Sequence, residues 1–336
     1  MPASFNHLAI ETVEQILDII DPPGDSELPD PITLARLNRT SKSLNALTTW
    51  RLYRAPRYRY SNWPLFARTV MARRDLAAMV KDLYFGGNVF DDPLDPDKFP
   101  EEVATYYLKN MDPETHFPLT TDDPDEETLF SADGDGETSA YIEMDFILNL
   151  CRNVETLFVN LMLCHEAFGL LDPPTSLPKL KSVNFGYNNA VDGFAVDHRL
   201  SYTILKAAGP SLTKLEISRA NSCFGFDFAL ENVTELIVGY SAISGTAFRN
   251  LLSLVPNLEK LEYQGGGSML DRDGLAEQFT THEAMEAVEA ARCLTLKSFR
   301  FDFTHNDIDS QWLSREEVER AREWFKGRGV EFEVIY

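Results

Sequence analysis

A six-residue apolar phrase recurs seven times along this chain of 336 residues. Each copy has an apolar residue, two mostly polar residues, an apolar residue, any residue and a last apolar residue. The copies read VKDLYF, VETLFV, LKSVNF, LTKLEI, VTELIV, LEKLEY and LKSFRF. The alternation that ends each phrase has the period of a β-strand, so we expect seven short strands. Self-similarity at a spacing of a few tens of residues indicates a repeat architecture, in which equivalent strands lie side by side.

The spacing between the copies indicates which kind of repeat this is. The middle apolar residues, taken as markers, are Leu83, Leu157, Val183, Leu215, Leu236, Leu261 and Phe299, and from Leu157 onward they are 26, 32, 21, 25 and 38 residues apart. Leucine-rich repeats run about 20 to 29 residues, so some units match them and others need inserted loops. Asn153, Asn232 and Asn257 each directly precede a phrase, which strengthens the similarity.

Helical patterns separate the phrases. Apolar residues recur at spacings of three and four in Tyr141–Leu150, Val196–Ala208, Gly245–Leu254 and His282–Ala291. A last helix is expected over Arg315–Lys326, followed by a closing strand in VEFEVIY. The predicted fold class is therefore α/β: residues 56–336 form an irregular leucine-rich-repeat solenoid with a parallel sheet.

The strand geometry predicts a binding face. Successive side chains of a strand point to opposite faces, so the residue between the last two apolar positions of each phrase points away from the core. Stacked parallel strands would align these residues on the concave surface, where repeat proteins usually bind. Phe158 and Ile237 are apolar, so either a partner or a neighbouring loop must cover them. The expected target-binding residues are Tyr84, Phe158, Asn184, Glu216, Ile237, Glu262 and Arg300.

The N-terminal part has a different pattern. Residues 7–20 read HLAIETVEQILDII and place apolar residues on one helical stripe, and the segment from Ile32 to Leu47 does the same. The residues LAIETVEQILDII, LARLNRTSKSLNAL and WRLYR resemble the F-box motif of fungal proteins, over about residues 5–54. We therefore expect residues 1–55 to form a small helical module of that kind.

The resemblance implies a function. F-box modules dock onto the small adaptor subunit of SCF-type cullin ubiquitin ligases, and the repeats behind them recruit a protein target. The residues expected at the adaptor are Leu8, Ile10, Glu11, Val13, Ile16, Leu17, Leu34, Leu37 and Leu44. An alternative is a leucine-rich-repeat interaction scaffold unconnected to ubiquitination, whose N-terminal helices merely cap the solenoid.

Charge is concentrated in one segment. Asp91–Glu137 holds sixteen acidic residues and two lysines, within a formal charge of −22 for the chain. We expect a solvated, partly disordered insertion there, either an expanded loop or a tail that recruits a basic partner. Arg51–Lys81 is basic and rich in aromatic residues, but the acidic remainder repels polyanions, so packing of the aromatics is expected rather than nucleic-acid binding.

Catalytic, metal and membrane signals are missing from the sequence. The six histidines have no metal-ligand spacing, no nucleophile elbow occurs, and no apolar run reaches 18 residues. Cys151, Cys164, Cys223 and Cys293 are too scattered for a disulfide framework and are expected to be reduced and mostly buried. We expect a non-enzymatic protein of the cytosol or nucleus, without cofactor or membrane contact.

Overall fold

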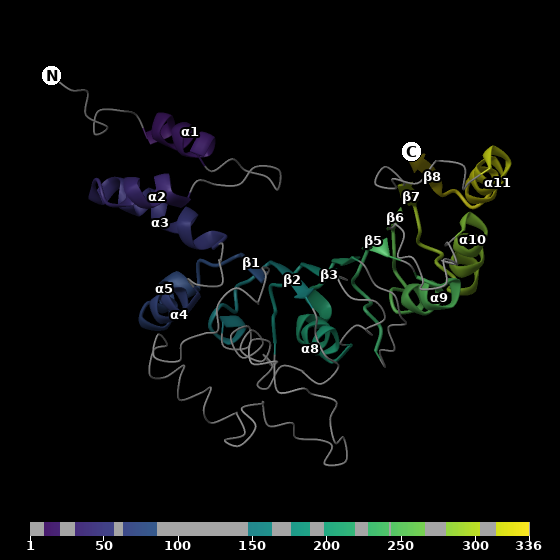
Figure 1. The fold of residues 1–336 in the computed structure, drawn as a ribbon, viewed down its shortest axis with the longest axis horizontal. Coiled ribbons are helices and arrows are strands. Elements are labelled where there is room, and N and C mark those ends of the chain that lie inside the picture. Colours follow the sequence, from purple (N-terminus) through teal and green to yellow (C-terminus); the bar gives the residue numbers. More distant parts are fainter. Residues whose placement is uncertain are drawn as a thin grey trace, which may run out of the picture.

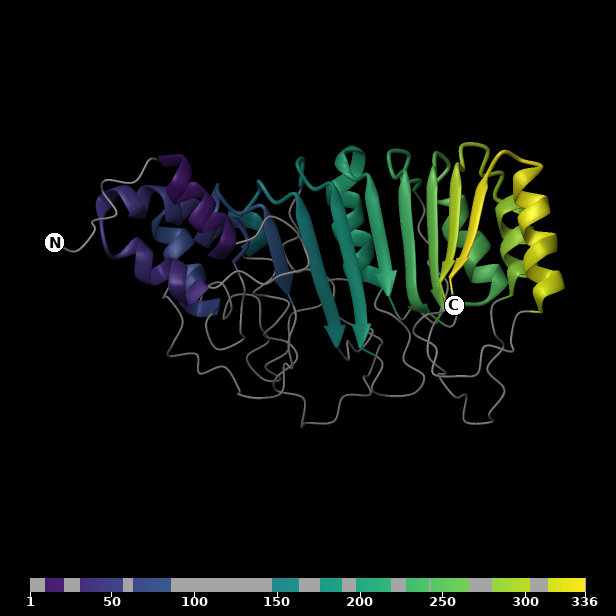
Figure 2. The ribbon, with the colours of Figure 1, turned by 90° about the horizontal axis from the view of Figure 1, so that it is seen from above.

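The computed structural model describes residues 10–20, 31–56, 63–85, 147–162, 176–188, 198–218, 228–241, 243–265, 280–302 and 314–335. Its strands form one eight-stranded sheet whose order across the sheet is the order along the chain. Figure 2 shows them side by side and running in the same direction. They are β1 (Asp82–Phe85), β2 (Thr156–Met162), β3 (Ser182–Asn188), β4 (Lys214–Ser218), β5 (Glu235–Ser241), β6 (Lys260–Gly265), β7 (Ser298–Asp302) and β8 (Glu331–Ile335).

The seven recurring phrases form β1 to β7, and the closing segment forms β8. All pairings are parallel, and the register places the marker residues in one line across the sheet, from Leu83 opposite Leu157 to Phe299 opposite Phe332. Each residue of that line is at most 8% exposed. The prediction that the phrases are neighbouring strands of a single parallel sheet is confirmed.

Helices cover one face of this sheet. Figure 1 shows the strands along an arc with these helices on its outer side, so the other sheet face lines the concave inner side. The apolar rows of the strands pack under the helices in one continuous core, in which burying each leucine-sized side chain contributes about 1.5 to 3 kcal/mol. The helices are α8 (His198–Ala208), α9 (Gly245–Ser253), α10 (Thr281–Ala290) and α11 (Arg315–Lys326), and the short 3-10 turn η4 (Gly209–Ser211) follows α8.

These helices agree with the sequence predictions to within two residues at each end. Of the helix expected over Tyr141–Leu150, residues 147–150 are described and helical, and Ile147 and Leu148 are fully buried. The acidic insertion lies outside the described residues. Within the described ranges, no helix is both long and apolar enough to cross a lipid bilayer.

Polar side chains connect five of the strand-forming units to the unit before them. Asn153 donates to the Ala78 carbonyl at 3.0 Å, Asn232 to that of Pro210 at 2.9 Å, and Asn257 to that of Glu231 at 2.8 Å. Ser211 and Thr295 occupy the equivalent position before their own phrases and donate to carbonyls of the preceding unit. These bonds satisfy backbone acceptors in the turns, which would otherwise lose hydrogen bonds on burial.

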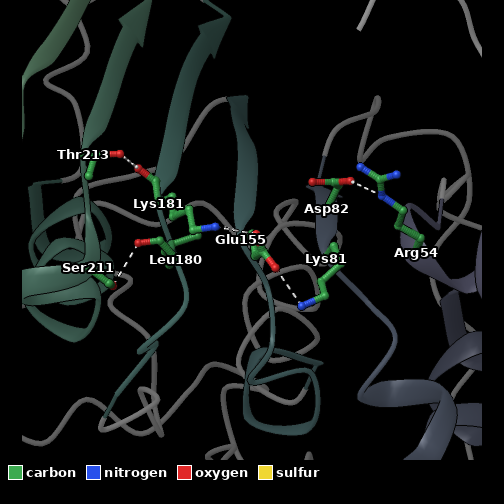
Figure 3. A network of polar contacts seen from close by, with 8 residues as sticks. All are labelled: Arg54, Lys81, Asp82, Glu155, Leu180, Lys181, Ser211 and Thr213. Atoms are coloured by element: carbon green, nitrogen blue, oxygen red, sulfur yellow. Dashed lines mark hydrogen bonds and ion pairs between the residues drawn. The ribbon is translucent and has the colours of Figure 1, made fainter. Parts of the chain in front are cut away.

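Ion pairs connect the residues that directly precede the first three strands, at the edge of the sheet where the strands begin. Figure 3 shows Glu155 between Lys81 and Lys181, with its two carboxylate oxygens 2.7 and 2.8 Å from the lysine Nζ atoms. The lysines hold the pKa of the Glu155 carboxyl at about 2, through hydrogen bonds first from Lys181 and then from Lys81. The ionised carboxylate therefore joins three successive repeats.

Three helices form a separate N-terminal group: α1 (Ile10–Ile20), α2 (Pro31–Asn38) and α3 (Lys42–Arg54). The sequence pattern suggested one helical segment over Ile32–Leu47, which is wrong because the chain turns between Asn38 and Lys42. Ser41 starts the new helix: it has an extended backbone, and its hydroxyl accepts a hydrogen bond from the Leu44 amide. The buried residues of the three helices form a cluster distinct from the core of the sheet.

Two further helices, α4 (Trp63–Ala72) and α5 (Arg74–Ala77), connect this group to the sheet and contribute to the sheet's core. At the junction Tyr53 of α3 stacks on Phe66 of α4 with ring centroids 6.4 Å apart. Arg54 lies 3.6 Å from the carboxylate of Asp82 at the start of β1, as Figure 3 shows. For Tyr53 and Phe66, this agrees with the expectation that the aromatics between the two parts pack the junction.

Candidate protein-binding surfaces

The concave face carries the row of residues that the sequence placed there. The register aligns Tyr84 with Phe158, Phe158 with Asn184, and so on through Glu216, Ile237, Glu262 and Arg300, and it adds Glu333 of β8. Tyr84, Arg300 and Glu333 are exposed, whereas Phe158, Asn184, Glu216 and Glu262 are half-buried.

Ile237 differs from its neighbours in this row. It is only 8% exposed, so a target could not make extensive contact with its side chain. Its place in the target-binding set therefore needs correction: it lies in the concave row and is one of the residues that line a hollow, but its side chain is almost fully buried. Such coverage depends on the side chains of adjacent strands, which strand periodicity alone does not reveal.

An aromatic pair occupies the β1 end of the row. Tyr84 and Phe158 stack almost parallel, with centroids 4.3 Å apart and planes 6° from each other. Gly186 on β3 makes room for this pair, because a Cβ atom there would lie 3.1 Å from the Phe158 ring. Tyr84 remains 44% exposed, so this end of a mostly polar row presents an aromatic side chain to solvent.

A charged hollow of about 230 Å³ occupies the other end, over β5 to β8. Arg300 is engaged by Asp302 at 3.1 Å, and just beside the hollow Lys214 of β4 is engaged by Glu235 at 3.2 Å. The polar and charged residues that line the hollow are Glu235, Lys260, Glu262, Ser298, Arg300, Glu331 and Glu333.

Glu216 lies in the same row, next to this hollow on β4. Its burial raises the pKa of its carboxyl, and the carboxylates of Glu262 and Glu235 raise it further. Lys214 and a hydrogen bond with Asn184 oppose the shift. The middle of the concave face therefore favours an incoming positive charge.

The N-terminal helices divide the residues expected at an adaptor into two groups. Val13, Leu17, Leu34 and Leu44 are at most 6% exposed and pack against one another, so they hold the helices together and cannot contact a partner directly. The prediction that these four residues contact an adaptor directly is therefore corrected: they form the core of the helical group.

The remaining members of that set have different positions. Glu11 is exposed, and Ile16 and Leu37 are half-buried. Leu8 and the Ile10 side chain lie outside the described residues. The sequence missed Ile19 and Trp50, which are 80% and 41% exposed. The exposure of Ile19 could have been predicted from the sequence, because Ile19 is an apolar residue that lies next to the apolar stripe of the helix and not within it.

Neither a metal-binding cluster nor a reactive thiol occurs in the described part of the chain. No group of three or more histidine, cysteine or acidic side chains is placed there to hold a metal ion. Cys151 and Cys293 are free and buried, as expected for them, and burial raises their thiol pKa values to about 12 and about 11. Such thiols are poor nucleophiles at neutral pH because the thiolate is scarce. Cys164 and Cys223 lie outside the described residues.

Comparison with known proteins adds no assignment: no protein-family model matches the chain, and no curated protein resembles it significantly.

Proposed function

We propose that this protein is a non-catalytic, substrate-recruiting subunit of an SCF-type cullin ubiquitin ligase. The helices α1 to α3 would dock onto the ligase adaptor, and the concave sheet face would bind the protein target. The observation that carries the proposal is a helical group with its own apolar core that leaves Ile19 exposed at 80%, beside a parallel sheet with an open face. Docking onto an adaptor would bury this exposed apolar side chain.

The scaffold alternative makes a different prediction for these helices. Helices that only cap a solenoid should pack their apolar residues onto its first repeat. The buried residues of α1 to α3 instead pack among themselves, while α4 and α5 supply residues such as Ala67 and Val70 to the sheet core. Capping of the array therefore falls to α4 and α5, which supports a separate role for the first three helices.

Exposed apolar positions offer a clean test of adaptor docking. Ile19→Asp should abolish co-purification of the tagged protein with the SCF adaptor and cullin, because it places a charge within the proposed contact. The side chain is 80% exposed, so the thermal unfolding temperature should fall only slightly, because a carboxylate in the last turn of α1 opposes the helix dipole. Leu294→Asp is the matched control, since Leu294 is 91% exposed in the connection between α10 and β7, far along the sheet from α1. If the Ile19→Asp protein captures as much adaptor as the wild type does, the proposed docking surface is wrong.

A further inference from the structure

Carboxylates alternate along the central row of the concave face. Glu216 lies on β4, Glu262 on β6 and Glu333 on β8, and the register places all three in one line. Adjacent strands of a sheet are about 4.8 Å apart, so residues on every second strand recur at about 10 Å. The face therefore presents negative charge at a regular interval across the strands.

These carboxylates are not neutralised by their surroundings. Of the cations on this face, Arg300 and Lys214 are bound to Asp302 and Glu235. Lys260 lines the same hollow, where the carboxylates of Glu235, Glu262, Glu331 and Glu333 outnumber the two cations Lys260 and Arg300. Glu262 accepts a hydrogen bond from Gln264 at 2.8 Å, and Glu216 interacts with Asn184, but within the described ranges none of the three carboxylates has an ion pair. A partner that supplies positive charge would relieve the repulsion among them.

The spacing matches an extended peptide. A polyproline II segment rises about 3.1 Å per residue and has three residues per turn, so every third side chain lies on one face at about 9 Å. Laid across the strands, such a segment would bring one side chain to each carboxylate. Beyond β4 the row changes to Asn184 and the aromatic pair of Phe158 and Tyr84, where charge pairing would stop.

We propose that the concave face over β4 to β8 binds an extended, basic segment of the target, with Lys or Arg at about every third residue. The proposal rests on the proposed role of this face as the target-binding surface and does not depend on the ligase partnership. A polyanion is disfavoured by the same carboxylates, so the occupant is a protein segment rather than a nucleic acid.

A peptide-binding experiment tests the proposal on the full chain. The probe is a fluorescent peptide with lysine at every third position, separated by serine and proline, and its partner has the same composition with contiguous lysines. Fluorescence polarisation should show tighter binding of the periodic peptide and loss of affinity with added salt. Absence of binding, or equal binding of both peptides, would overturn the proposal.

Matched charge variants separate the site from general attraction to an acidic protein. Glu262→Gln with Glu333→Gln should weaken binding of the periodic peptide about tenfold. The control pair, Glu316→Gln with Glu323→Gln, makes the same change of charge on α11, outside the arc, and should change affinity less than about twofold. Equal losses in both pairs would attribute binding to net charge and refute the site.

Adaptor capture, measured in the same preparations, distinguishes this proposal from the function proposed above. The Glu262→Gln, Glu333→Gln protein should still co-purify with the adaptor. If Ile19→Asp leaves adaptor capture intact while the periodic peptide binds as expected, the ligase role fails and the basic-target site stands. If adaptor capture is lost as expected but the peptides do not discriminate, only the basic-target site fails.

Discussion

Glu155 shows how much one half-buried side chain contributes when it contacts the two neighbouring strand units. Its carboxylate bridges Lys81 and Lys181, and its folded-state pKa of about 2 is well below its ordinary value of 4.5. A depressed folded-state pKa gives stability that is present above the ordinary value and is lost as the pH falls toward the folded value. The contribution is therefore expected at neutral pH and should vanish between about pH 4.5 and pH 2.

Glu155→Gln should reduce the free energy of unfolding by about 0.5 to 1 kcal/mol at pH 7, a small effect because solvent screens the partly exposed pairs. Urea unfolding of wild type and variant across the acidic range measures it, and the difference should shrink below pH 4.5. Glu259→Gln serves as control, since Glu259 has one lysine partner, Lys297 at 2.8 Å, and should lose less. A difference that does not vary with pH would contradict the charged bridge.

At the scale of single elements, α11 is closed at its start by a reciprocal pair of hydrogen bonds. Ser314 accepts from the Glu317 amide at 3.2 Å, and Glu317 accepts from the Ser314 amide at 2.9 Å. The backbone and hydroxyl of Ser314 also lower the pKa of the Glu317 carboxyl. This arrangement satisfies two amides that a helix start would otherwise leave without partners.

Ser314→Ala should therefore destabilise the last helix by about 1 kcal/mol. Because α11 covers the C-terminal end of the sheet, the loss should appear first as faster amide hydrogen exchange in α11 and β8. Ser253→Ala is the control, since the Ser253 hydroxyl bonds a carbonyl within the last turn of α9 and caps no helix start. Equal acceleration of exchange in both variants would show that the cap contributes nothing specific.

The elements themselves were predictable because their patterns are local. The alternation of apolar and polar residues predicted the strands β1 to β7. Because the seven phrases have the same pattern, they were expected to pair in the same register, and this predicted the aligned row from Tyr84 to Arg300. The break before Ser41 was missed because neither Gly nor Pro marks it; the turn depends on the Ser41 cap. The sequence left open whether a partner or a loop covers Ile237, and it placed Leu17 on an apolar helical stripe. Their actual exposures, 8% and 1%, could not be predicted because they depend on side chains from other strands and helices.

For the whole molecule, the two separate cores imply two stability units. Leu17, 1% exposed, belongs to the cluster of α1 to α3, whereas Leu215, fully buried, belongs to the core of the sheet. A cavity in one cluster removes apolar contacts that the other does not share. Each unit should therefore respond to its own substitutions.

Leu17→Ala should cost about 2 to 5 kcal/mol within the helical unit and raise hydrogen exchange there, with little change in the sheet. Leu215→Ala should have the converse effect. Hydrogen exchange monitored by mass spectrometry resolves the two regions in one experiment. If either substitution raises exchange uniformly along the chain, the molecule unfolds as one cooperative unit and the division is wrong.

The order of the strands has a mechanical consequence. Every strand pairs only with the strands before and after it in the chain, so force applied at the two termini need not break the whole sheet at once. Units at the ends would peel away first, each releasing a short length of chain while the interior strands stay paired. A protein built this way would yield to traction in small successive steps, and a tethered target could strain one end while the remainder keeps its shape.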